Sequence, residues 1–323
     1  MAASAAEHGA DVATLPGAIR PASRWRFRRP AHLLYAICAV ELVGSVGLAL
    51  AFGFRAASLS AFLPQLYCAL LVACGPLLRR IDRPRLAGAF ETVGFLYGQG
   101  FALVAALYPM TAIAAPFADA QLAAVDRALH FNWLELARLV GAYPLVIASL
   151  KAVYFSFGWQ GVVILPALFM ARQAERSWTT ILAANLALVL TLLIYPFAPA
   201  QGTFIHYHIS PEQYPNMAVR VAWSFGPAIE AIRDGGARFI TRELMVPFVS
   251  FPSYHAVAAV LLGWAAWPLK TLRWPFLLLN VCMAFSAMII GAHYLVDLIG
   301  GALVAIVSIA LARRLLIRVS EAV

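Results

Sequence analysis

Long apolar runs separated by short polar segments dominate the chain between residues 32 and 312. Most runs approach the roughly 20 residues that an α-helix needs to cross a hydrocarbon core of about 30 Å. A membrane β-barrel would instead show short segments of alternating hydrophobicity. The pattern therefore predicts an all-α polytopic membrane protein with about eight transmembrane helices, at residues 32–54, 59–78, 86–108, 144–170, 178–197, 251–268, 275–292 and 293–312.

Two longer polar segments interrupt this pattern. Residues 110–143 combine charged side chains with a helical apolar period from Leu122 to Trp133, which predicts an amphipathic segment on the outer surface. Residues 198–250 form a long connection without a strong period, and connections of this length are often functional. We divide the chain into a cytosolic tail (1–30), two N-terminal transmembrane helices (31–85) and a membrane core (86–318).

Composition supports the membrane assignment and argues against nucleic acid and metal as partners. The chain is 63% hydrophobic and only 12% charged, with a mean hydropathy of +0.80, which excludes an ordinary soluble domain. The net charge of +9 is split into short basic clusters between apolar runs, so we interpret it as a topology signal and expect no nucleic-acid partner. The four cysteines lie in apolar runs without metal-ligand spacing, which predicts free thiols and no metal.

The distribution of basic residues predicts one orientation. With eight crossings and a cytosolic N-terminus, sixteen of the 24 Lys and Arg residues fall in inner segments, while the outer ones are nearly cancelled by acids. Both termini are then cytosolic. The stretches IYPFAPAQG, FPSYHA and GAHYLVD all fall on the opposite, outer side. Three motifs at one depth predict a functional site there.

His293 and Asp297 are the first candidates for this site. At positions i and i+4 of a helix they would share one face, and the carboxylate would accept the Nδ1 hydrogen of the imidazole. This bond leaves Nε2 unprotonated and nucleophilic. The alternatives are a structural hydrogen bond at a helix start and a metal-ligand pair, although a metal site needs further ligands.

His255 is the second candidate, in the stretch FPSYHA. We expect Ser250 to cap the helix that follows, with Pro252 in its first turn and Ser253 presenting its hydroxyl and nearby N–H groups outward. Such a helix start favours phosphate, and His255 one turn further in is suited to protonate a leaving oxygen. The alternative is an ordinary helix cap.

These two motifs together resemble the type-2 phosphatidic acid phosphatase superfamily, whose signature pairs PSGH with SR-x5-H-x3-D. FPSYHA with HYLVDLIGG is similar in particular to the inositol phosphorylceramide synthase branch, including its bacterial members, and the likeness is best over residues 119–314. It implies a six-helix core, here preceded by two extra helices. It also implies that His293 forms a phosphohistidine, Asp297 orients it, and His255 is the general acid and base, without metal or other cofactor.

The chain departs from this signature in its phosphate-binding residues. The first superfamily motif, K-x6-RP, is absent, and Ala287 stands where the third motif has arginine. Replacement cations must come from elsewhere, because a loosely held phosphate is attacked slowly. The candidates are Lys151, Arg233, Arg238 and Arg242, each of which has the alternative of contacting only the membrane surface.

The sequence therefore predicts phosphoryl or phospho-headgroup transfer on membrane lipids. An alcohol such as ceramide as acceptor gives an inositolphosphotransferase, whereas water gives a phosphatase for phosphatidic acid or a prenyl diphosphate. A transporter and an inactive structural relative are the remaining alternatives. We expect the protein in a bacterial inner membrane, with its site facing the periplasm.

Overall fold

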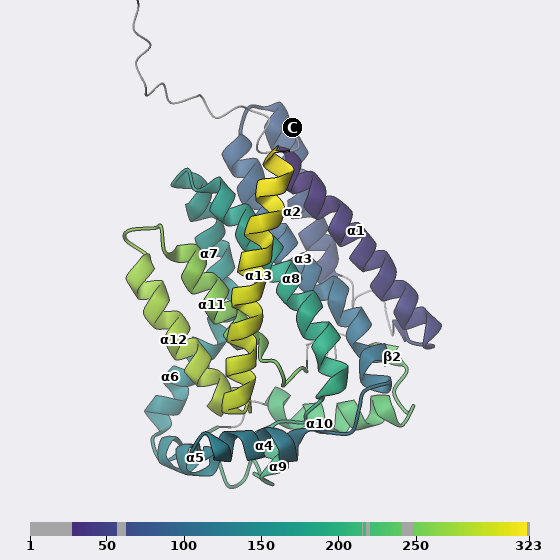
Figure 1. Cartoon of the computed structure of the whole chain (residues 1–323), viewed down its shortest axis with the longest axis vertical. Coiled ribbons are helices and arrows are strands. Elements are labelled where there is room, and N and C mark those ends of the chain that lie inside the picture. The colour runs from purple at the N-terminus through teal and green to yellow at the C-terminus, as the bar shows by residue number, and fades with distance from the viewer. Residues whose placement is uncertain (1–27, 57–62, 215, 218–219, 241–247, 322–323) are drawn as a thin grey trace, which may run out of the picture.

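The computed structural model describes residues 28–56, 63–214, 216–217, 220–240 and 248–321. In this part of the chain, long and shorter helices form a bundle along the long axis of the molecule, as Figure 1 shows. They are α1 (Arg28–Ala51), α2 (Leu63–Arg80), α3 (Pro84–Ala112), α6 (Pro144–Phe155), α7 (Phe157–Met170), α8 (Ala174–Ile194), α11 (Tyr254–Ala266), α12 (Arg273–Ile290) and α13 (Leu295–Glu321). The predicted all-α fold is confirmed.

Shorter elements cross one end of this bundle, the lower end in Figure 1. They are α4 (Asp119–Ala128), α5 (Trp133–Gly141), α9 (Thr203–His206) and α10 (Arg220–Arg233), with a single 3₁₀ turn at Tyr195–Phe197 and the two-residue strands β1 (Arg55–Ala56) and β2 (Phe239–Ile240). The C-terminus lies at the opposite end. We call the crossed end the histidine end, because it holds the motifs discussed below, and the other end the basic end.

Five of the described helices are long and apolar enough to cross a membrane, namely α1, α3, α8, α12 and α13. Helices α5 and α6 pass the same test together but are bent by 112°, which would make a sixth. Helices α7 and α11 are apolar but shorter, and α2, which ends on Arg79 and Arg80, is not among the five. These helices define an integral membrane protein.

The predicted crossing at 144–170 consists of two helices. α6 begins at Pro144, where a missing N–H costs nothing, and it ends at Phe155. Ser156 separates it from α7, and the Ser156 hydroxyl donates to the carbonyl of Val153. The interruption is important for the site. Tyr154 lies before Ser156 and Phe157 lies after it, and both rings lie against His255 of α11.

The amphipathic segment predicted at 110–143 is also divided. Its first residues extend α3 to Ala112, and the rest forms α4 and α5, which are joined by residues 129–132. Leu122 and Trp133 are buried as the period predicts, but Leu129 is 49% exposed. The apolar face predicted from Leu122 to Trp133 is therefore not continuous. Each short helix packs separately against the end of the bundle.

The connection at 198–250 is partly structured. It contains α9 and α10, and β2 pairs in parallel with β1, with Arg55 opposite Phe239 and Ala56 opposite Ile240. Residues 215, 218–219 and 241–247 lie outside the described part of the chain. The strand pair joins this connection to the segment that follows α1.

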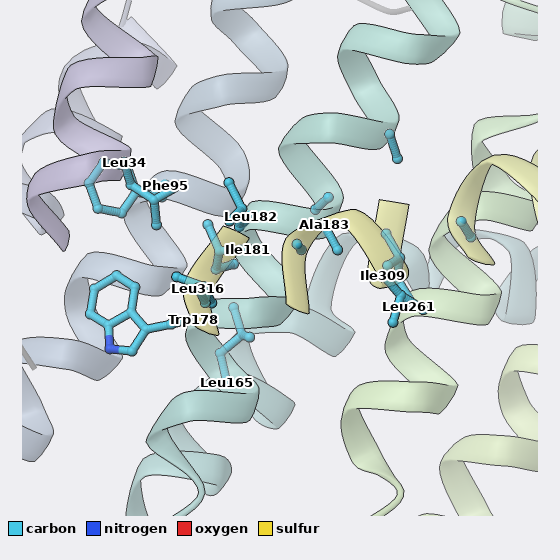
Figure 2. Close-up of a cluster of buried hydrophobic side chains, with 14 of the residues drawn as sticks. Leu34, Phe95, Leu165, Trp178, Ile181, Leu182, Ala183, Leu261, Ile309 and Leu316 are labelled. Carbon is cyan, nitrogen blue, oxygen red and sulfur yellow. The ribbon is translucent and has the colours of Figure 1, made fainter. Parts of the chain in front are cut away.

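A buried apolar cluster joins α3, α7, α8, α11 and α13 in the middle of the bundle (Figure 2). Its largest buried members are Phe95, Phe169 and Trp178. The backbones of α11 and α13 approach closely beside this cluster. A Cβ atom added at Gly301 would lie 2.2 Å from the carbonyl oxygen of Ser253, so only glycine allows this approach.

Polar bonds inside the membrane helices attach the N-terminal helices to the rest. Glu91 of α3 is fully buried, accepts a hydrogen bond from Tyr35 of α1 and forms an ion pair with Arg79 of α2. Asn185 of α8 donates to both carboxylate oxygens of Glu41 of α1 at 2.8 Å. These ionisable side chains have partners in the neighbouring helix, as buried charges require.

Candidate functional site

His293 and Asp297 lie in direct contact at the histidine end. Nδ1 of His293 is 3.2 Å from Oδ2 of Asp297, and both side chains are nearly fully buried. Because an ionised carboxylate only accepts hydrogen bonds, the hydrogen of the neutral imidazole is on Nδ1, and Nε2 carries a free lone pair. The sequence placed both residues on one helix, but α13 begins at Leu295. His293 precedes the helix, and the contact forms because Asp297 is in its first turn.

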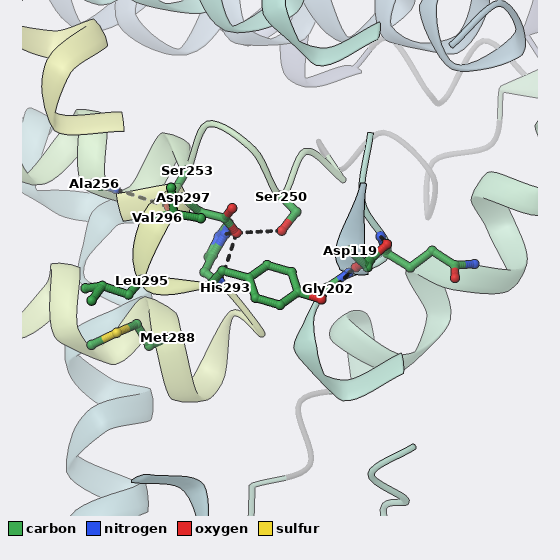
Figure 3. Close-up of polar contacts among 12 residues, drawn as sticks. Asp119, Gly202, Ser250, Ser253, Ala256, Met288, His293, Leu295, Val296 and Asp297 are labelled. Carbon is green, nitrogen blue, oxygen red and sulfur yellow. Dashed lines mark hydrogen bonds and ion pairs between the residues drawn. The ribbon is translucent and has the colours of Figure 1, made fainter. Parts of the chain in front are cut away.

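The same carboxylate oxygen accepts two further hydrogen bonds, as Figure 3 shows in part. The hydroxyl of Ser250 donates to Oδ2 of Asp297 at 2.7 Å, and the backbone N–H of Tyr294 donates at 3.0 Å. The bond from Tyr294 closes the start of α13 in the manner of a capping box. Three donors on one oxygen stabilise the charged carboxylate and fix its direction toward His293.

Helix α4 holds the segment around His293 from outside. Asp126 accepts the N–H groups of Leu295 and Val296, each at 2.9 Å, and so satisfies two donors at the start of α13. Asp119 accepts the hydroxyl of Tyr294 at 2.9 Å. Burial raises the pKa of Asp126, and the charge of Asp297 adds to this, while the two N–H donors oppose it.

Asp119 also fixes the loop before α9, since it accepts the backbone N–H groups of Gln201 and Gly202. Helix α5 adds a further bond, from the indole N–H of Trp133 to the carbonyl of Met288 at 3.0 Å. The sequence indicated that Asp126 and Trp133 anchor an interfacial helix. The structure gives both residues a more specific position, because they hold the two backbone segments that flank His293.

His255 lies across from His293. It is the second residue of α11, and its ring centroid is 6.2 Å from that of His293. Reacting groups in a productive complex are about 3 to 3.5 Å apart. A group placed between the two imidazoles can therefore contact both. The two rings come from different helices and meet at the same end of the bundle.

Aromatic rings from α6 and α7 hold His255 in place. Tyr154 stacks on the imidazole with the centroids 4.0 Å apart and the planes at 20°, and Phe157 lies 5.4 Å away. Gly291 lies against both Tyr154 and His293. A Cβ atom built on Gly291 would be 2.9 Å from both Cε2 of Tyr154 and Cδ2 of His293. Tyr154 therefore lies beside both histidines.

The start of α11 differs from the prediction. Ser253, not Ser250, is the N-cap, and its hydroxyl accepts the N–H of Ala256 at 3.4 Å. The N–H of Ser253 is also used, since it donates to the carbonyl of Asp297 at 3.0 Å. Ser253 is fully buried. The outward N–H expected at this position is not observed, and only the hydroxyl hydrogen of Ser253 remains to donate.

The predicted phosphate-binding cations are separated by the structure. Arg233 donates to the carbonyl of Ala114 at 3.2 Å and lies over the ring of Phe117, whereas Arg238 lies over Phe54. These contacts belong to the side of the bundle formed by α1 and α3, away from the histidine pair. Arg242 lies outside the described residues.

Lys151 is in a different position. It is half-buried on α6, three residues before Tyr154. Residues three apart are neighbours on a helix surface, so Lys151 shares the face of α6 that carries Tyr154 toward His255. Of the predicted cations in the described segments, Lys151 is the one on an element that contacts a histidine of the site.

Metal ligation is not supported by the arrangement. The described residues contain no group of three or more His, Cys, Asp or Glu side chains able to hold a metal ion. The stretch HYH at residues 206–208 adds two histidines but no such group. His208 is exposed, and the ring of His206 lies 6.1 Å from the ring of Tyr294. Burial lowers the pKa of His206.

Sequence reasoning missed three residues of this site or gave them another role. Ser250 was interpreted as a helix cap, although it bonds Asp297. Tyr154 carried no signal except its spacing of three from Lys151. Asp119 was not singled out, although its spacing of seven from Asp126 places both carboxylates on one face of a helix.

The fold and the site define a class: an all-α integral membrane protein with two histidines and a carboxylate gathered at one end of its helices. The family model described as the PAP2 superfamily matches residues 120–311, and the chain belongs to this superfamily. The match begins in α4 and ends in α13, so it contains Tyr154, Ser250, both histidines and Asp297, while Asp119 lies just before it. No curated protein and no solved structure gave a match. Membership supports a phosphatase-type activity in general.

The position of the missing superfamily arginine is filled by an apolar cluster. Ala287 is fully buried and packs with Ala256, Met288 and Leu298, with Tyr154 against the cluster. A long charged side chain has no room at this position.

Proposed function

We propose that the protein transfers a phosphoryl or phospho-headgroup between membrane lipids through a phosphohistidine at His293, without a metal. The observation that carries this proposal is the meeting of two imidazoles, 6.2 Å apart, one of which is bonded to a buried carboxylate. A nucleophile, its orienting acid and a facing proton donor are the groups that such a transfer needs. Membership in the PAP2 superfamily supports the same reaction class.

In the first step, Nε2 of His293 attacks the phosphorus atom of the donor lipid. The bond between phosphorus and the oxygen of the leaving alcohol breaks, and protonated His255 gives its proton to that oxygen. In the second step, His255 takes the proton of the acceptor hydroxyl. The acceptor oxygen attacks phosphorus and the N–P bond breaks, which restores both histidines. Asp297 stabilises the positive charge on His293 during attack.

For the phosphate we propose Lys151 as the main cation, with the hydroxyl of Ser253 as an additional donor. The position of Lys151 on the helix that carries Tyr154 supports this choice. Arg233 and Arg238 lie over Phe117 and Phe54 near the ends of α3 and α1, so we rank them below Lys151. A preorganised cation stabilises the charge that develops on the phosphoryl oxygens.

For the acceptor we propose an alcohol, as in inositol phosphorylceramide synthase-like phosphotransferases. The support is the similarity of FPSYHA and HYLVDLIGG to that branch, together with its bacterial members. The donor is then phosphatidylinositol or a related phospholipid, and ceramide is the candidate acceptor. Hydrolysis of phosphatidic acid or a prenyl diphosphate is the alternative outcome with water. We place the site on the periplasmic face of a bacterial inner membrane.

A transporter that relays protons is less well supported. Such a relay needs ionisable groups along a path through the membrane. Glu91 is paired with Arg79, and Glu41 with Asn185. Each pair lies between two neighbouring helices. Both histidines, in contrast, lie together at one end. This arrangement favours chemistry at the surface over passage through the bundle.

The test uses the protein purified in detergent and incubated with radiolabelled phosphatidylinositol, phosphatidic acid or a prenyl diphosphate, each with and without ceramide. We expect a labelled phosphosphingolipid only when ceramide is present. Release of water-soluble phosphate without ceramide would establish the phosphatase instead. Full turnover by His293→Ala would contradict the proposed nucleophile. His208→Ala, at an exposed histidine of the same end, is the matched control and should retain activity.

A further inference from the structure

The basic end of the molecule contains a concave site. A hollow of about 470 Å³ is lined by Arg176 of α8, by Gly263, Trp264 and Trp267 at the end of α11, and by Leu277 of α12. We call it the Arg176 hollow. Trp264 and His255 are nine residues apart on α11, a rise of about 14 Å, so this hollow is separate from the histidine site.

Arg176 is held at the wall of this hollow by Trp264. Its guanidinium carbon lies 3.2 Å from the centre of the indole ring, and the guanidinium donates to the backbone carbonyl of Trp264. Its Nε is enclosed and has no hydrogen-bond partner in the described part of the chain. The contact with the ring leaves part of the charge without a hydrogen-bonding partner.

Arg79, at the same end, has the carboxylate partner that Arg176 lacks in the described ranges of the chain. Arg79 is similarly enclosed, but its charge is neutralised by the buried carboxylate of Glu91. Among the described residues no carboxylate pairs with Arg176, and the neighbouring Glu175 is exposed. Because a partly buried charge is stabilised by pairing, an anion from outside the chain would be favoured beside Arg176.

Two further arginines interact with residues that line the hollow. Arg273 lies 6.0 Å and 5.8 Å from the rings of Trp267 and Trp274, and its Nε is also enclosed without a partner in the described segments. Arg313 of α13 interacts electrostatically with Arg176. Like charges repel each other, so an anion between them is favoured by all three arginines.

We propose that the Arg176 hollow binds the phosphate of an anionic phospholipid from the leaflet at the basic end. The apolar wall supports a lipid over a free phosphate, because Leu277 and the indole rings offer a surface for acyl chains. Trp267 and Trp274 are 46% and 59% exposed, as is typical of tryptophans at a membrane interface. Basic pockets between membrane helices are known to bind lipid headgroups. This site does not depend on the proposed catalytic function.

The test is native mass spectrometry of the full chain, purified and delipidated in detergent and then titrated with phosphatidylglycerol or phosphatidylcholine of equal acyl chains. We expect the wild-type protein to bind phosphatidylglycerol more tightly than phosphatidylcholine. Arg176→Gln should weaken phosphatidylglycerol binding by about tenfold, as expected for loss of a charge-assisted hydrogen bond. Arg80→Gln, at an exposed arginine of the same end, is the matched control and should bind as the wild type does.

Three results would overturn the proposal: equal binding of the two lipids, an equal loss in Arg80→Gln, or displacement of bound phosphatidylglycerol by millimolar inorganic phosphate. The last would indicate a site for free anions. Because Arg176 also bonds the end of α11, Arg176→Gln could fail to fold. Arg273→Gln keeps that bond and should weaken phosphatidylglycerol binding in the same direction, and unchanged binding in this variant would equally contradict the proposal.

Discussion

Tyr154 is the residue whose position depends most on the break between α6 and α7. Its ring covers one face of His255 at 4.0 Å. We expect Tyr154→Leu to lower kcat/KM by about two- to tenfold, since ring stacking contributes about 0.5 to 1.5 kcal/mol. Tyr154→Phe keeps the ring and should restore most of the activity. Steady-state kinetics with the donor lipid will measure this.

The matched control for Tyr154 is its neighbour. Phe155 is 57% exposed, and Phe155→Leu should leave kcat/KM unchanged. If Phe155→Leu and Tyr154→Leu lose activity equally, the effect belongs to the helix as a whole. In that case stacking on His255 would not be the function of Tyr154.

Ser250 acts through Asp297 in this account and does not touch the substrate. Removing its hydroxyl takes one of three donors from Oδ2 of Asp297, and a hydrogen bond to a charged group contributes about 1.5 to 3 kcal/mol. Ser250→Ala should therefore lower kcat by about tenfold or more with little change in KM. Ser250→Thr, which keeps the donor, should recover part of the loss.

Ser149→Ala is the control for Ser250→Ala. Ser149 is exposed on α6 and donates only within its helix, to the carbonyl of Leu145. Its kinetics should match those of the wild type. A large rise in KM for Ser250→Ala, with kcat unchanged, would contradict a positioning role and indicate direct substrate contact.

The contact between His293 and Asp297 was predictable from the sequence, but the hydrogen bonds of Ser250 and Ser253 were not. The spacing of His293 and Asp297 predicts a contact, and the structure has one. Ser250 and Ser253 are both suitable caps, and nothing local decides between them. The choice depends on Asp297, which lies 47 residues from Ser250 in the chain and accepts its hydroxyl.

At the scale of helices, the close approach of α11 and α13 brings His255 and Asp297 to one place. Gly301→Ala would put a Cβ atom 2.2 Å from the carbonyl oxygen of Ser253, and backbone cannot move aside cheaply. We expect a cost of about 1 to 3 kcal/mol in the free energy of unfolding, and a loss of activity. Thermal unfolding followed by tryptophan fluorescence will measure the first effect.

Gly47 provides the comparison for Gly301. It lies within α1, and an added Cβ would meet nothing within 4 Å. Gly47→Ala should therefore be neutral or slightly stabilising, because alanine favours a helix more than glycine does. Equal unfolding temperatures for Gly301→Ala and the wild type would show that the two helices are not packed as described.

Several helix boundaries, such as those of α8 and α12, were predictable within a few residues where a long apolar run ends at charged side chains or proline, but α13 continues past Arg313 and Arg314 to Glu321. The division of 144–170 into α6 and α7 was not predictable, because both halves are apolar and Ser156 is compatible with a helix interior. The bend of 112° between α5 and α6 was also missed, since it depends on packing against the end of the bundle.

For the whole molecule, the orientation in the membrane remains a prediction from charge. Ala128 lies at the histidine end and Ala171 at the basic end, and both are exposed. In a protein without its native cysteines, Ala128→Cys should react with an impermeant maleimide in intact cells. Ala171→Cys should react only after permeabilisation. The reverse pattern would place the site on the cytosolic side, and labelling of both from one side would contradict the crossings.

The meeting of the motifs at one end was predictable from topology, because an even number of crossings separates FPSYHA from HYLVD. The preference for Lys151 in our proposal was not. Four candidates were compatible with the sequence, and only their packing separates Lys151 on α6 from Arg233 and Arg238. This separation depends on long-range packing, which no local sequence pattern predicts.

The most direct test of the central claim is to trap the covalent intermediate. The protein is mixed with ³²P-labelled phosphatidylinositol in the absence of ceramide, quenched in base within milliseconds and digested for peptide mapping. We predict base-stable, acid-labile label on the peptide that contains His293, present in the wild type and in Ser250→Thr and absent from His293→Ala. Label that persists in His293→Ala, or that maps to His255, would contradict the account.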